Sequence, residues 1–115
     1  AVIAELAPEA LAGLSAAPAR FTPTRGVHAG VPCSGVAFTV TDPRTLRSVR
    51  LGVALGRALL RAHRAHWQPA GVLTLLGSER AFLALASGAP VAAVEATWQD
   101  DLGAFQRRRH PHLLY

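Results

Sequence analysis

Apolar residues in this sequence repeat with two different periods, and this change of period is the strongest constraint on the fold. Residues 36–40 alternate apolar with small or polar side chains, the two-residue repeat of a half-buried strand. After a turn at Asp42-Pro43, apolar residues recur at helical spacing from Ser48 to about His66. With 115 residues, 50% of them hydrophobic, the chain is long enough to bury one core. We therefore expect a single α+β domain over residues 1–115, in which a small sheet packs against three or four helices.

The other elements are predicted from hydrophobic spacing and from Gly, Pro and Ser at their ends. By residue number, we expect a first helix over 2–14, a loop over 15–20, an extended segment over 20–22, a long loop over 25–35, a short strand or extended loop over 73–76, a helix over 79–87 and a last helix from 90 to about 110. Ser48 and Ser78 are expected to cap the helices that follow them.

The last predicted helix carries one apolar stripe at helical spacing, formed by Val91, Val94, Trp98, Leu102 and Phe105. In a globular domain a stripe of this kind faces the core. Pro111 predicts that the helix ends by about residue 110. We expect the whole stripe to be buried and the apolar tail over residues 112–115 to pack as well.

The positive charge of the chain comes from arginine alone. All twelve basic residues are Arg, the net charge is +5, and Lys, Asn and Met are absent. A GC-rich genome accounts for this bias without selection for anion binding, so the charge is weak evidence for a nucleic-acid partner. Four arginines share one side of the helix predicted after Ser48, with no aromatic side chains between them: Arg50, Arg57, Arg61 and Arg64. We interpret them as a solvated helix face and expect no nucleic-acid partner.

Side chains suited to catalysis are few, and none of them has the spacing of a known site. The seven carboxylates offer no pair expected to face across a cleft. The five His form no metalloprotease pattern and the single Cys33 stands outside any Cys or His cluster, so no metal and no cofactor is expected. No run approaches the roughly 20 apolar residues of a membrane span, and none is expected. The chain has no initiator Met, so we expect it to be part of a longer product.

Several short motifs, taken in their order, carry a resemblance to a known family. They are Phe21-Thr-Pro-Thr, Gly30-x-x-Cys33-x-Gly35-Val36, Leu76-Gly77-Ser78, Gly88 before the last helix, the stripe through Trp98, and Leu113-Leu114-Tyr115 at the end. Over about residues 21–115 the chain resembles the C-terminal domain of the bacterial exo-β-N-acetylmuramidases, the NamZ-like glycoside hydrolases. Residues 1–20 fit this family more loosely.

The resemblance implies a two-domain parent protein. A larger, Rossmann-like N-terminal domain that carries the catalytic carboxylate is expected upstream, and the present chain is then the smaller domain that closes one side of the cleft. Enzymes of this family remove terminal N-acetylmuramic acid from the non-reducing end of peptidoglycan fragments, without a nucleotide or metal cofactor. The expected partners are these fragments and the N-terminal domain, and the expected location is the cell envelope or outside the cell rather than the cytoplasm.

The resemblance also makes the long loop the candidate site. Residues 22–35 are expected to line the cleft, and the candidate substrate-binding residues are Thr22, Thr24, Arg25, His28 and Cys33. Arg25 or His28 is expected to meet the lactyl carboxylate of the sugar through a charge-assisted pair. The alternative hypothesis is a non-catalytic module that binds wall polymer or a partner protein. The sequence upstream of residue 1 discriminates between the two.

Overall fold

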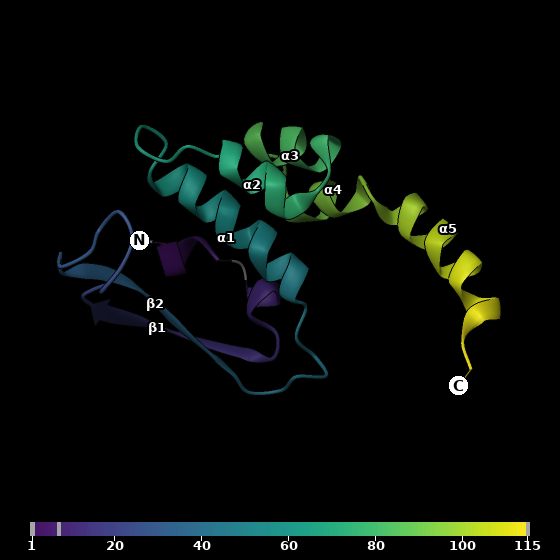
Figure 1. Cartoon of the computed structure of the whole chain (residues 1–115), viewed down its shortest axis with the longest axis horizontal. Coiled ribbons are helices and arrows are strands. Elements are labelled where there is room, and N and C mark those ends of the chain that lie inside the picture. Colours follow the sequence, from purple (N-terminus) through teal and green to yellow (C-terminus); the bar gives the residue numbers. More distant parts are fainter. Residues whose placement is uncertain (1, 7, 115) are drawn as a thin grey trace.

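The computed structural model describes residues 2–6 and 8–114 and has a mixed architecture (Figure 1). Within these residues the elements, in chain order, are the 3₁₀ turns η1 (Val2–Glu5) and η2 (Pro8–Leu11), strands β1 (Leu14–Phe21) and β2 (Cys33–Val40), helices α1 (Ser48–Ala62), α2 (Ala70–Leu76), α3 (Glu79–Ala86), α4 (Val91–Ala96) and α5 (Gln99–Arg109), and the 3₁₀ turn η3 (His110–His112). The α+β class is confirmed, with five short or medium helices where we expected three or four.

The sheet is a two-stranded antiparallel ribbon that runs in register from the pair Leu14 and Val40 to the pair Phe21 and Cys33. The strand predicted over residues 36–40 is confirmed and begins earlier, at Cys33. The loop predicted over residues 15–20 is wrong, because these residues form most of β1. Their small side chains and Pro18 have low strand propensity, but each strand of a two-stranded ribbon has a free edge, where a proline is tolerated.

Closely packed backbone segments, joined by hydrogen bonds, connect the start of β1 to the turn after β2. Gly13 has φ +76°, and its carbonyl accepts hydrogen bonds from the backbone N–H groups of Thr41 (2.9 Å) and Asp42 (3.2 Å). The Asp42 carboxylate accepts from the Thr45 hydroxyl and the Arg44 backbone N–H, and these two bonds, the first above all, lower its pKa. The turn predicted at Asp42-Pro43 is thus confirmed. The first helix predicted over residues 2–14 is wrong, since the chain forms two single 3₁₀ turns before Gly13.

The core lies on two sides of α1. One cluster of buried side chains joins the N-terminal turns to α1, and the other joins α1 to α3 and α4; the members are Leu6, Ala10, Ala54 and Ala58 in the first and Val53, Ala81, Leu85 and Val94 in the second. In Figure 1 the N-terminal turns lie between the ribbon and α1, while α2, α3 and α4 gather on the far side of α1. Small residues on α1 allow this close approach from both sides.

Several helix boundaries depart from expectation. Helix α1 begins at Ser48, so that Arg47 rather than Ser48 holds the N-cap position, and the helix ends at Ala62 instead of about residue 66. Residues 70–76 form α2 where we expected a strand or extended loop. Helix α3 is confirmed with its predicted cap, because the Ser78 hydroxyl accepts a hydrogen bond from the Ala81 backbone N–H at 3.3 Å.

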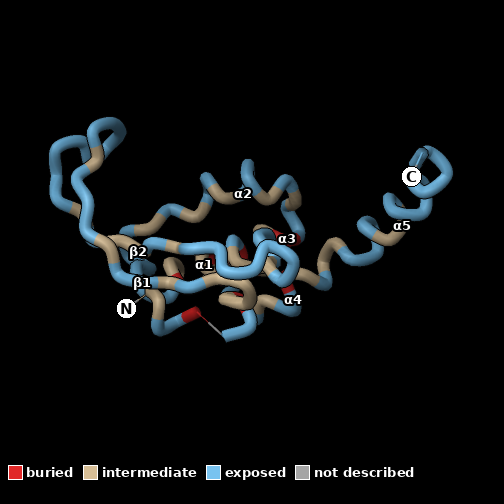
Figure 2. Tube along the Cα trace, turned by 90° about the horizontal axis from the view of Figure 1, so that it is seen from below, coloured by how far each residue is buried: buried red, intermediate tan, exposed pale blue. Residues whose placement is uncertain are grey.

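The last predicted helix is two helices, α4 and α5, which are separated at Thr97 and Trp98. Val94 is fully buried and Trp98 packs against the second cluster, but Leu102 is 41% exposed and Phe105 is 50% exposed. Figures 1 and 2 show α5 extending away from the other helices. The expectation of one fully buried stripe is therefore wrong for its second half. The predicted end of the helix is confirmed, since α5 stops at Arg109.

The C-terminal tail is not packed. Leu113 is 40% exposed and Leu114 is 95% exposed, which contradicts the expected packing of the tail. The last residue of that expectation, Tyr115, lies outside the described residues.

The arginines of α1 contact neighbouring elements. Arg50 forms a bidentate pair with Glu95 on α4, with Nε 3.0 Å from Oε1 and Nη2 2.5 Å from Oε2. Arg57 donates to the Gly88 carbonyl at 3.5 Å. Arg61 pairs with Glu5 in the first turn at 3.2 Å. The expected solvated face is confirmed for Arg61 and Arg64, which are exposed, and is wrong for Arg50 and Arg57, which are half-buried against neighbouring elements.

Candidate functional site

The loop between β1 and β2 projects from one end of the ribbon, at the opposite end of the molecule from α5 (Figure 1). Its conformation is set by backbone hydrogen bonds, from Gly30 N–H to the Pro23 carbonyl (2.8 Å) and from Val31 N–H to the His28 carbonyl (3.0 Å). Gly26 and Gly30 both have positive φ, which allows the chain to reverse direction twice. The loop is thus a defined turn structure whose side chains are exposed.

The structure separates the five candidate residues into two groups. Thr22 and Cys33 lie at the base of the loop and line a pocket of about 260 Å³. Thr24, Arg25 and His28 lie further out, are exposed, and do not line this pocket. The loop was predicted as a single site, but the structure gives it two parts: a pocket at its base, and the exposed side chains of Arg25 and His28 beyond that pocket.

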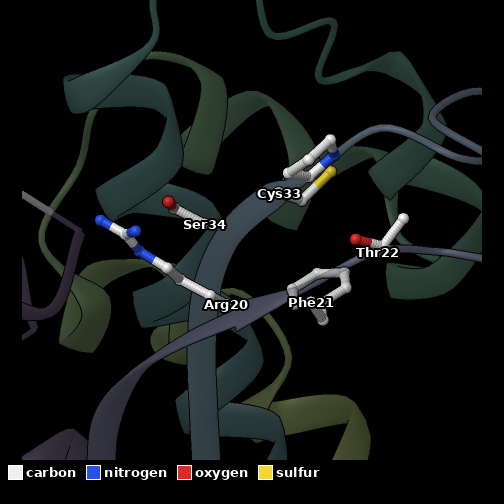
Figure 3. A pocket seen from close by; sticks show the side chains of 6 residues that line it. Arg20, Phe21, Thr22, Cys33 and Ser34 are labelled. Atoms are coloured by element: carbon white, nitrogen blue, oxygen red, sulfur yellow. The ribbon is translucent and has the colours of Figure 1, made fainter.

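Four further residues line this pocket, Arg20, Phe21, Pro32 and Ser34 (Figure 3). Of these, Arg20 and Phe21 lie outside residues 22–35, which were predicted to line the cleft. Strand register explains their position: Arg20 lies opposite Ser34, and Phe21 lies opposite Cys33. Directly opposed residues share a face of the ribbon. Figure 3 shows Arg20 and Ser34 pointing to one side and Phe21 and Cys33 to the other. Residues 14–21 show no apolar–polar alternation that would mark this strand in the sequence, because most of their side chains are small.

The base of the loop is well defined by side-chain contacts. The Phe21 ring lies over Gly35, where an added Cβ would come within 2.7 Å of the ring carbon Cε1. An aromatic ring that covers a glycine on the neighbouring strand is a common way to stabilise a ribbon. The Cys33 thiol donates to the Val31 carbonyl at 3.4 Å, and its side chain is partly exposed. The lining residues therefore carry polar groups on both faces of the ribbon, with the Arg20 guanidinium and the Ser34 hydroxyl on one face and the Cys33 thiol on the other.

Four of the seven carboxylates have structural partners. Asp42 stabilises its own turn, and Glu5, Glu95 and Asp101 each pair with an arginine. The hydrogen bonds from Arg50 hold the pKa of Glu95 below its ordinary value, against a smaller opposing effect of burial. Across residues 2–6 and 8–114, no cluster of three or more His, Cys, Asp or Glu side chains is placed to hold a metal ion. None of the helices described there is long and apolar enough to cross a bilayer.

The domain thus has an exposed loop that carries Arg25 and His28, and four of its seven carboxylates take part in structural contacts. A family model described as "Exo-beta-N-acetylmuramidase NamZ, C-terminal" matches residues 1–115, and the chain belongs to this family. The match includes residues 1–20, which the sequence motifs had fitted only loosely. No curated protein and no solved structure matches the chain. The family consists of glycoside hydrolases that act on the N-acetylmuramic acid of peptidoglycan, and its C-terminal domain implies an N-terminal partner domain.

Proposed function

We propose that this domain forms one wall of the substrate cleft in a two-domain exo-β-N-acetylmuramidase. In this proposal the larger, Rossmann-like N-terminal domain carries the catalytic carboxylate, and the enzyme hydrolyses terminal N-acetylmuramic acid from the non-reducing end of wall fragments. Family membership supports the reaction class. The structural use of Asp42, Glu5, Glu95 and Asp101 supports placing the acid chemistry elsewhere. The parent protein is then expected at the cell envelope or outside the cell, where these fragments occur.

The observation that carries the proposal is the exposed loop with its pocket. N-acetylmuramic acid differs from N-acetylglucosamine by a lactyl ether, which adds one carboxylate to the sugar. Arg25 and His28 lie on the exposed part of the loop, where either can meet that carboxylate in a charge-assisted pair. Thr22 and Cys33 at the base of the loop, and Thr24 further out, supply hydroxyl and thiol groups for the sugar itself. The loop thus recognises the group that distinguishes the substrate.

The first test is hydrolysis of a chromogenic N-acetylmuramide by two proteins, the 115-residue chain and the same chain joined to its upstream sequence. Activity in the longer protein alone is the expected result, because the catalytic carboxylate is placed upstream. Activity in neither protein would favour the alternative, a non-catalytic module that binds wall polymer or a partner protein. Activity in the 115-residue chain alone would contradict the placement of the catalytic carboxylate in the N-terminal domain.

The second test addresses the loop in the intact parent. Replacing both Arg25 and His28 with alanine removes the groups that meet the carboxylate, and a lost charge-assisted hydrogen bond of about 1.5–3 kcal/mol raises KM for the muramide roughly 10- to 100-fold. Arg44→Ala is the matched control, because Arg44 is an exposed arginine on the turn at the other end of the ribbon. An unchanged KM in the double variant would contradict the assignment of the loop.

A further inference from the structure

The apolar stripe that runs from Val91 to Phe105 is buried or half-buried as far as Trp98 and exposed to solvent along α5. Trp98 packs against the second core cluster, whereas Leu102 and Phe105, three residues apart on one face of α5, are 41% and 50% exposed. The Arg109 guanidinium lies 6.0 Å from the centre of the Phe105 ring and so extends this face toward the end of the helix. We call these three side chains, Leu102, Phe105 and Arg109, the α5 face.

Helix α5 has little within the described part of the chain to stabilise it. It has 11 residues and includes Gly103, whereas isolated helices shorter than about 12–15 residues are marginal in water even in favourable sequences. Its first turn is held by Trp98 and by an ion pair between Arg80 and Asp101 (2.7 Å). Both partners of that pair are more than two-thirds exposed, so the pair contributes little. A stable α5 therefore needs a surface that covers its apolar face.

A groove at the root of α5 continues this apolar surface. It has a volume of about 440 Å³ and lies between the N-terminal end of α1 and the junction of α4 with α5. Its lining includes Val49, which is 61% exposed, together with Trp98 and Leu102. Arg47 lines the same groove beside them. The groove and the α5 face share Leu102 and together form one apolar surface, which is bordered at the groove by Arg47 and by the ion pair between Arg50 and Glu95.

We infer that this surface docks the N-terminal domain of the same polypeptide, an inference that rests on the two-domain parent of the proposed function. The family match places such a domain in the same chain. A linked domain is present at an effective concentration far above that of a free partner, which favours docking through a modest surface. The contact region of the N-terminal domain is accordingly apolar.

Covalent linkage distinguishes this occupant from a second copy of the chain. Helix α5 carries Asp100 and Asp101 in its first turn and three arginines, Arg107, Arg108 and Arg109, in its last turn, so an antiparallel pair of α5 helices would also bring opposite charges together. The N-terminal domain is linked to every copy of the surface, whereas a second copy reaches it only at sufficient protein concentration. The dependence of α5 protection on protein concentration therefore separates the two occupants.

The arrangement of the elements also allows one body to meet both functional regions. Figure 2 shows the loop between β1 and β2 and helix α5 rising on the same side of the molecule, at opposite ends, with α2 between them. Helix α2 presents Leu75, which is 87% exposed. The loop and α5 therefore both project toward the space on this side of the molecule, where a single further domain can reach them.

Hydrogen exchange measured by mass spectrometry tests the inference on the intact parent and on the 115-residue chain. Amides in α5 are expected to exchange at least about tenfold more slowly in the parent, because docking supplies the packing that the helix lacks. Equal exchange of α5 in the two proteins would overturn the inference. Protection in the isolated chain that rises with protein concentration would also overturn it, since a second copy would then be the occupant.

A matched pair of variants in the intact parent makes the test specific to the α5 face. Replacing Leu102 and Phe105 with aspartate is expected to remove most of the α5 protection, whereas Leu83→Asp, at a position 58% exposed on α3, leaves it in place. Retained protection in the Leu102 and Phe105 variant, or equal loss in the control, would overturn the docking surface. Failure here is separable from failure of the proposed function, because hydrolysis and its dependence on Arg25 and His28 are measured independently of α5 exchange.

Discussion

Replacing Gly13 with alanine tests how tight the junction between β1 and the turn after β2 is. Gly13 has φ +76°, and an added Cβ would overlap the backbone oxygen of Asp42 and lie 2.9 Å from the backbone nitrogen of Leu46. Gly30 has the same φ of +76°, but nothing lies within 4 Å of a Cβ built there. Gly30→Ala is therefore a matched control that has the same backbone conformation without the steric overlap.

The two substitutions share one cost and differ in another. A left-handed conformation costs an alanine about 1–2 kcal/mol, of which about 0.4–1 kcal/mol is offset by the lower entropy of the unfolded chain. At Gly13 the overlap also separates groups that form two hydrogen bonds, Thr41 N–H to the Gly13 carbonyl (2.9 Å) and Leu46 N–H to the Asp42 carbonyl (3.2 Å). Each lost bond adds about 1 kcal/mol. We expect a loss of about 1 kcal/mol for Gly30→Ala and about 3 kcal/mol for Gly13→Ala.

Urea unfolding of the 115-residue chain, followed by the fluorescence of Trp67 and Trp98, measures both losses. The midpoints are expected to fall with an unchanged slope, because neither substitution alters the surface exposed on unfolding. Equal losses for Gly13→Ala and Gly30→Ala would refute the argument, because the steric overlap and its two hydrogen bonds would then contribute nothing.

The remaining predictions concern the two contacts that join α1 to its neighbours. Glu95→Gln is expected to lower the free energy of unfolding at pH 7, because it removes the ion pair with Arg50. Pairing lowers the pKa of Glu95 in the folded state. The extra stability of the wild type is therefore present above the ordinary pKa of 4.5 and is lost as the pH falls through the lower pKa of the folded state. Urea midpoints at pH 7 and pH 3 check this, and an advantage that is the same at both pH values contradicts it. Leu85→Ala is expected to cost about 2–5 kcal/mol, since Leu85 is 1% exposed, while Leu83→Ala, at 58% exposed, costs little. Similar losses for the two leucines would show that the second cluster is not the core.

Local signals in the sequence predicted the elements that depend on local physics. The alternation through residues 36–40, the Ser78 cap and the stop at Pro111 each act within a few residues, and each prediction is confirmed. Strand β1 was predicted only at its end, as the extended segment over residues 20–22. The rest of β1 is a strand because it pairs with β2, and the local sequence does not indicate this. The apolar run at residues 73–76 is too short for its period to separate strand from helix, and its packing beside α3 decides for helix.

The candidate site shows the same division. The loop itself was predictable from its glycines. Thr22 and Cys33 were named from the family resemblance and lie at the base of the loop, and their role in binding stays a prediction. Arg20 was not predicted, because its place beside the loop depends on a strand register that the sequence does not state. The apolar stripe was predicted to be buried along its whole length, but Leu102 and Phe105 in its second half are exposed. Its apolar pattern is a property of the sequence, whereas its burial depends on a surface that residues 2–6 and 8–114 do not provide.

Helix α1 contributes adjacent residues to different halves of the core, with Val53 in one cluster and Ala54 and Ala58 in the other. Neither cluster can lose this helix without the other losing it as well. The N-terminal turns and the α3–α4 pair, which are far apart in the sequence, are thereby coupled into one cooperative folding unit. The loop between the strands and α5 lie outside both clusters, so they can open or rearrange on contact with a partner while the coupled unit stays folded.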